Sequence, residues 1–133
     1  MEKKAKILLV DDDVDFVEAT KIVLESKPYE VIVAYQGEEG LQKARKENPD
    51  LILLDVIMPV KDGFAAAEQF KKDPKLSKIP IVMLTSFSTR GAGTGIPRSR
   101  GAALEAEDYV EKPINPQELL RKVETYLKPR TRG

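Results

Sequence analysis

The stretch LVDDD, Leu9 to Asp13, leads an apolar run directly into three consecutive carboxylates. The residues before it, KILLVD at 6–11, are apolar enough to form a buried strand. Neighbouring carboxylates repel one another and raise one another's pKa, so a strand that ends in them loses stability unless a positive charge lies nearby. A positive charge is therefore expected beside these acids.

Outward from this stretch, short apolar runs alternate with amphipathic segments. The pattern predicts strands at residues 6–11, 30–35, 50–55, 79–86 and 108–113, and helices at residues 14–26, 37–48, 62–73 and 115–127. Such alternation is typical of a parallel sheet with helices on both faces, and a chain of 133 residues is too short for a closed eight-stranded barrel. We therefore predict one α/β domain built on a five-stranded parallel sheet.

One segment departs from this rhythm. Residues 88–107 lie where a fourth helix is due, yet they contain Gly91, Gly93, Gly95, Pro97 and Gly101. An interior Gly costs a helix about 1 kcal/mol relative to Ala, and a Pro about 3 kcal/mol. We therefore expect an atypical Gly-rich region with room for a short helix only around residues 102–106. We also predict that the part from Ser88 to Arg100 is mobile or partner-dependent.

Composition excludes several kinds of chemistry. Lys and Arg together equal Asp and Glu at 22 each, so no overall basic field favours direct nucleic-acid binding, and no apolar run is long enough to span a membrane. We therefore expect a cytoplasmic location. The chain has no Cys and no His, which removes thiolate nucleophiles, Ser-His-Asp arrangements and most transition-metal sites. The carboxylates that remain suit Mg²⁺ or Ca²⁺.

Polar residues stand at the carboxyl ends of four predicted strands. They are Asp11 with Asp12, then Asp55, Thr85 and Lys112. In a parallel sheet these ends share one edge of the molecule, where open α/β sheets bind ligands. Mg²⁺ would relieve the repulsion among the acids and could hold a phosphoryl oxygen, and an Asp carboxylate can attack phosphorus to give an aspartyl-phosphate. Each acid alone would more simply be a helix cap, but the set together favours a site.

Four segments appear in an order that points to one family. They are ILLVDDD, PDLILLDVIMPVKDGF, IPIVMLTS and YVEKPI, and they include the specific string D-x-x-M-P-x-x-D-G from Asp55 to Gly63. Over nearly its whole length the chain resembles the receiver domain of two-component response regulators. The resemblance implies a flavodoxin-like, doubly wound fold with strand order 2-1-3-4-5. It also implies a receiver domain at residues 1–128, which is either a stand-alone receiver or one excised from a longer protein. We expect residues 129–133 to form a disordered tail, because chain ends are often poorly ordered.

The resemblance assigns roles at the acidic edge. Asp55 corresponds to the phosphoacceptor, Asp12 to a direct Mg²⁺ ligand, and Asp11 to the acid that holds the metal through water. Ile57 would lend its backbone carbonyl to the metal. Asp13, the third acid of LVDDD, corresponds to the N-cap of the first helix.

Three further residues match the family's switch. Thr85 corresponds to the hydroxyl that moves toward the phosphoryl group, Lys112 to the lysine that pairs with phosphate, and Tyr109 to the aromatic side chain that turns inward when Thr85 moves. Tyr109 could instead be a plain aromatic residue of an edge strand.

The resemblance also implies partners. The phosphoryl group would come from a phosphohistidine on a sensor histidine kinase or phosphotransfer protein, and an unknown downstream protein, or a second copy in a homodimer, would respond. The domain would catalyse its own phosphorylation and dephosphorylation without being a metabolic enzyme. One alternative is a pseudo-receiver that acts as an unphosphorylated interaction module. Another is a haloacid-dehalogenase-type phosphatase, which would need a second Asp where Ile57 stands.

Overall fold

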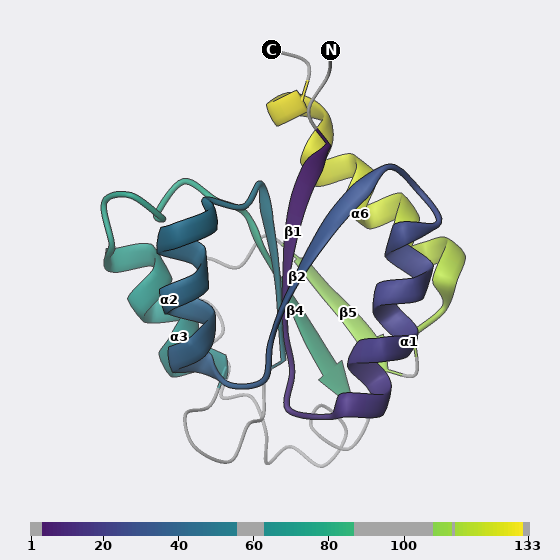
Figure 1. The fold of residues 1–133 in the computed structure, drawn as a ribbon, viewed down its shortest axis with the longest axis horizontal. Helices are drawn as coiled ribbons and strands as arrows, with labels where there is room; N and C mark the ends of the chain where they lie inside the picture. Colours follow the sequence, from purple (N-terminus) through teal and green to yellow (C-terminus); the bar gives the residue numbers. More distant parts are fainter. Residues whose placement is uncertain (1–3, 56–62, 87–107, 113, 132–133) are drawn as a thin grey trace.

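The fold is a single twisted sheet between two layers of helices (Figure 1). The computed structural model describes residues 4–55, 63–86, 108–112 and 114–131. The strands are β1 (Ala5–Val10), β2 (Tyr29–Ala34), β3 (Leu51–Asp55), β4 (Ile81–Ser86) and β5 (Asp108–Lys112). They are all parallel and lie in the order β2-β1-β3-β4-β5. The predicted flavodoxin-like, doubly wound architecture with order 2-1-3-4-5 is confirmed.

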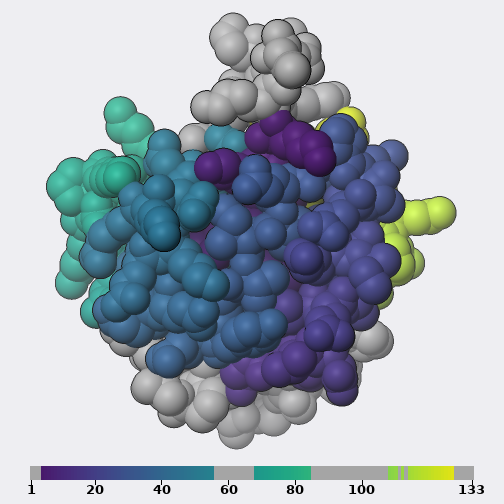
Figure 2. All heavy atoms as spheres, in the orientation of Figure 1, coloured from purple at the N-terminus to yellow at the C-terminus, as the bar shows by residue number. Residues whose placement is uncertain are grey.

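The central strands are apolar on both faces because both faces are covered. All five residues of β3 are buried, and Leu8 and Leu9 of β1, which point to opposite faces, are fully inaccessible. Burial of each large aliphatic side chain contributes roughly 1.5–3 kcal/mol, so these runs supply much of the hydrophobic stabilisation. The edge strand β2 is only half-buried, and the side chains of α1, β2 and α2 form one surface along that edge (Figure 2).

Helices cover the sheet in pairs. α1 (Val14–Glu25) and α6 (Pro116–Thr131) lie on one face, and α2 (Gly37–Glu47) and α3 (Gly63–Lys72) on the other (Figure 1). Each pair encloses a core. The α1/α6 core includes Leu9, Leu53 and Val123, and the α2/α3 core includes Val10 and Phe70.

Local sequence signals set the helix ends. Asp13 is the N-cap of α1, as predicted, and its Oδ1 accepts a hydrogen bond from the Phe16 N–H at 3.1 Å. Asn115 Oδ1 accepts from the Glu118 N–H at 3.0 Å and caps α6 in the same way. α2 ends at Asn48, whose φ of 55° places it in the left-handed region that Asn tolerates better than most residues.

The structure shifts several predicted boundaries. β1 and β2 lie one residue earlier than predicted, because Tyr29 pairs with Ala5 at the start of the ladder. The expected boundary at residue 128 falls inside α6, which continues to Thr131, so the first residues of the expected disordered tail are helical. The Gly-rich region at 88–107 lies outside the described residues. Among those that are described, no helix combines the length and apolar character needed to cross a bilayer.

Candidate functional site

The Asp11 carboxylate is buried at the carboxyl end of β1. Asp11 has no exposed surface. The backbone N–H of Asp11 donates to the Ala34 carbonyl of β2 at 3.1 Å, which continues the pairing of β1 with β2 by one hydrogen bond. Its Oδ1 accepts from the Asp13 N–H at 3.0 Å, and its Oδ2 accepts from Lys112 Nζ at 2.8 Å. The positive charge that meets these acids in the structure is therefore a lysine from the far end of the chain.

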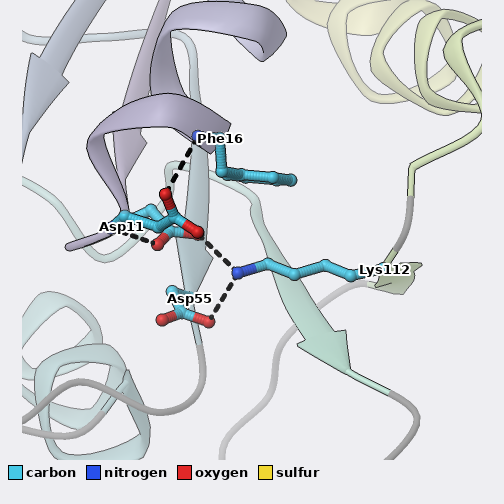
Figure 3. Close-up of polar contacts among 5 residues, drawn as sticks. Asp11, Phe16, Asp55 and Lys112 are labelled. Atoms are coloured by element: carbon cyan, nitrogen blue, oxygen red, sulfur yellow. Dashed lines mark hydrogen bonds and ion pairs between the residues drawn. The ribbon is translucent and has the colours of Figure 1, made fainter.

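Asp55 ends β3 next to this pair. Its side chain is 9% exposed, and its Oδ1 lies 3.5 Å from Lys112 Nζ (Figure 3). Lys112 ends β5, and β4 separates β5 from β3 in the sheet. The lysine side chain therefore reaches over one strand to contact Asp55 and over two to contact Asp11.

Three carboxylates converge at this edge. One oxygen from each of Asp11, Asp12 and Asp55 lies within 4.8 Å of the others, and Asp12 is exposed while the other two are buried. Burial, and then the charge of Asp11, raise the pKa of Asp55 to about 6, although Lys112 opposes the shift. Burial also raises the pKa of Asp11. An all-oxygen donor set with unrelieved negative charge fits a hard divalent cation.

Lys112 is held from three sides. Burial lowers its pKa, but the hydrogen bond to Asp11 and the charges of Asp11 and Asp55 outweigh burial and raise it. The third contact is with Phe16 of α1, whose ring centroid lies 4.3 Å from Lys112 Nζ. The ammonium is therefore charged and sits between two carboxylates and an aromatic ring (Figure 3).

Of the three other predicted site residues, the structure describes Thr85 and Tyr109 but not Ile57. Thr85 is in β4, where its backbone pairs with Glu111 of β5, and Ile57 lies outside the described residues. Tyr109 is half-buried in β5 and packs against the α2/α3 core. Its N–H donates to Asp108 Oδ1 at 2.7 Å and its carbonyl accepts from Lys122 Nζ of α6 at 2.8 Å. The backbone at Tyr109 is thus tied directly to α6.

Phe16 was not among the site residues predicted from the sequence. The structure adds its contact with Lys112. The available signal was its position three residues after the N-cap Asp13, which lies directly beside the acids. That signal places the residue near the site but does not reveal the orientation of its ring.

The fold and this cluster define a class of protein, a flavodoxin-like α/β domain with acids and a lysine at the carboxyl edge of its sheet. Within that class, the chain belongs to the response regulator receiver domain family, which it matches over residues 7–124. Receiver domains of this family serve phosphorylation-dependent signalling in two-component systems. They bind Mg²⁺ in an acidic active site and interact with histidine kinases or phosphotransfer proteins.

Individual relatives agree with this assignment. PhoP, the alkaline phosphatase synthesis transcriptional regulatory protein of Bacillus subtilis, is 38% identical over 123 residues, which cover 92% of this chain and 48% of PhoP. The chain spans about half the length of such curated relatives. The chemotaxis response regulator CheY4 of Vibrio cholerae is 33% identical with a TM-score of 0.82, and the match covers 94% of this chain and 100% of that one.

A third relative was solved with a metal ion. It is the receiver domain of the sensor histidine kinase PA1611 from Pseudomonas aeruginosa, with magnesium coordinated in its active-site cleft. It is 26% identical to this chain with a TM-score of 0.83, and the match covers 95% of this chain and 99% of that one.

Proposed function

We propose that this chain is a signalling switch that accepts a phosphoryl group on Asp55 in the presence of Mg²⁺. The observation that carries the proposal is the meeting of Asp55 with Asp11, Asp12 and Lys112 at one edge of the sheet. Asp55 ends the central strand within reach of the lysine and the other acids, and its side chain, unlike that of Asp11, is not fully buried. The membership of this chain in the receiver family supports the same role for Asp55.

The chemistry is an in-line displacement at phosphorus. One Asp55 carboxylate oxygen attacks the phosphorus of a phosphohistidine, the bond from phosphorus to the imidazole nitrogen breaks, and that nitrogen keeps the electron pair. Asp55 must be ionised to attack, which its pKa of about 6 allows at neutral pH. Lys112, already 3.5 Å from Asp55, would offset negative charge on the phosphoryl oxygens.

The acids fit the role of Mg²⁺ ligands. Asp11, Asp12, Asp55 and the backbone carbonyl of Ile57 would hold the ion. When bound, Mg²⁺ neutralises charge on the acids and on the transferred group. The phosphohistidine donor must lie outside the residues of this chain, because they include no His. A sensor histidine kinase or phosphotransfer protein has the required chemistry.

The response would run through the last two strands. Thr85 would move toward the phosphoryl group and Tyr109 would turn inward, which changes the surface offered to a downstream protein or to a second copy of the chain. The direct hydrogen bond from Lys122 to the Tyr109 carbonyl supports a link between this strand and α6. Such a switch needs two states whose balance the phosphoryl group biases.

Acetyl phosphate tests the proposal without a cognate kinase. We expect intact-mass spectrometry to show one added phosphoryl group after incubation with acetyl phosphate and Mg²⁺. The gain should be absent in EDTA and in the Asp55→Asn variant, and should persist in Glu18→Gln, an exposed acid on α1 outside the site. A folded, Mg²⁺-binding protein that gains no mass from acetyl phosphate or from a phosphohistidine donor would instead be a pseudo-receiver.

A further inference from the structure

We propose that Phe16 is a positioning residue that holds the Lys112 ammonium at the phosphoacceptor through the face of its ring, a role that rests on the function proposed above. The ring centroid lies 4.3 Å from Lys112 Nζ, inside the range of about 6 Å over which a cation is attracted to an aromatic face. Figure 3 shows the ring and the two carboxylates on different sides of the ammonium.

The backbone of Phe16 belongs to the same hydrogen-bonded turn as the acids. The Asp13 N–H donates to Asp11 Oδ1 at 3.0 Å, and Asp13 Oδ1 accepts from the Phe16 N–H at 3.1 Å. The backbone of Phe16 is therefore connected to the Asp11 carboxylate through one residue. The third acid of LVDDD, which caps the helix, thus holds the backbone of the residue whose ring contacts the lysine.

Lys112 needs such support because its side chain is long and must stay in one conformation. It reaches from β5 across β4, and 22% of the side chain is exposed to solvent. A lysine loses much rotamer freedom when it is held in one place. Its contact with Asp11 at 2.8 Å is shorter than its contact with Asp55 at 3.5 Å, so an additional contact helps to keep the ammonium within reach of the acceptor.

Phe16 also packs against the α1/α6 core, so a plain packing role is the competing explanation. The two roles depend on different properties of the ring. Packing depends on volume and apolar surface, whereas attraction of a cation depends on the negative charge of the ring face. Fluorine atoms on the ring withdraw that charge while they change its size little. A fluorinated series therefore separates the two roles.

The first experiment places 4-fluorophenylalanine or 3,4,5-trifluorophenylalanine at position 16 of the full chain. The readout is the initial rate of phosphorylation by acetyl phosphate with Mg²⁺, followed by intact mass. We expect the rate to fall with each added fluorine, by about three- to tenfold for the trifluorinated ring and for Phe16→Leu. The same substitutions at Phe70, fully buried in the α2/α3 core, should leave the rate unchanged. A rate that stays constant along the series at position 16 overturns the proposal.

A second experiment does not depend on phosphoryl transfer. Phe16→Leu and Lys112→Met are combined in a double-mutant cycle, and the folding equilibrium constant is measured without Mg²⁺. We expect Phe16→Leu to lower that constant by about two- to tenfold more in the wild-type background than in the Lys112→Met background. If the wild-type chain accepts no phosphoryl group, the proposed function fails, and this cycle alone decides the contact. Equal effects in both backgrounds would then overturn it.

Discussion

The Asp55 carboxyl group lies where its negative charge is costly. Its side chain is 9% exposed and faces two further acids, and these surroundings raise its pKa to about 6 from 3.8. Between about pH 4 and pH 6 the folded chain therefore holds a proton that the unfolded chain has released. Asp55 thus makes the Mg²⁺-free protein less stable as pH rises through this window, and the loss is complete above pH 6.

Replacement of this acid should therefore stabilise the protein. We expect Asp55→Asn to raise the free energy of unfolding by roughly 1–3 kcal/mol at pH 7 in EDTA, because the Lys112–Asp11 pair remains. The advantage should disappear by about pH 4. Urea unfolding followed by circular dichroism at both pH values measures it, with Glu18→Gln as the control. A variant that is less stable than the wild type at pH 7 would contradict this account of the site.

Removal of the lysine should have the opposite effect. Lys112→Met leaves the fully buried Asp11 without its cation, and we expect a loss of roughly 2–4 kcal/mol in EDTA at pH 7. Lys21→Met is the matched control, because Lys21 pairs with Glu25 at 3.6 Å on the exposed face of α1 and should contribute less than about 0.5 kcal/mol. Similar losses in the two variants would show that the Lys112 contacts do not stabilise the site.

At the scale of elements, α2 packs closely on the strand that leads to Asp11. A Cβ added at Gly40 would lie 2.9 Å from Val10 Cγ2, and Val10 is fully buried. Because a valine in a filled core cannot turn away freely, the helix would have to move. The glycine therefore allows α2 to approach the end of β1 closely.

This contact predicts the effect of Gly40→Ala. Alanine favours a helix by about 1 kcal/mol over glycine, but we expect the clash to outweigh this gain and to destabilise the protein by roughly 1–2 kcal/mol. In a Val10→Ala background the clash is removed, so there Gly40→Ala should be neutral or stabilising. Chemical denaturation of the four proteins of this cycle gives the coupling. A net stabilisation by Gly40→Ala alone would show that the space between α2 and Val10 accommodates a methyl group.

Most elements could be predicted from sequence because each carries its own local signal. β3 is an apolar run without alternation, as a strand covered on both faces must be, and Asp13 and Asn115 mark helix starts. Exact ends were less predictable, because pairing with a neighbour decides them. Asp11 ends the predicted strand but lies just past β1, although its N–H still bonds to Ala34.

At the scale of the whole molecule, topology explains why the site could be predicted at all. Parallel strands bring their carboxyl ends to one edge, so the order of residues along the chain suffices to gather Asp11, Asp55 and Lys112. The conformations of the side chains at the site could not be predicted from the sequence. Neither the closer approach of Lys112 to Asp11 than to Asp55 nor the Phe16 contact follows from sequence spacing.

Mg²⁺ should stabilise the whole domain by binding only the folded chain. At a concentration ten times the dissociation constant, the expected gain in the free energy of unfolding is about 1.4 kcal/mol. We expect thermal unfolding with a Mg²⁺ titration to show this rise in Tm for the wild type and a much smaller one for Asp12→Asn, because Asp12 is the exposed acid of the cluster. An equal rise in Tm for the wild type and Asp12→Asn would show that Mg²⁺ binds outside this cluster of acids.

The most direct test of the central claim is to locate the phosphoryl group within the chain. Borohydride reduces an aspartyl-phosphate to homoserine, so reduction after treatment with acetyl phosphate and Mg²⁺, followed by peptide sequencing in a mass spectrometer, marks the acceptor. We predict homoserine at position 55 and aspartate at positions 11 and 12. Homoserine at position 11 or 12, or a phosphorylated chain without homoserine at position 55, would contradict the account.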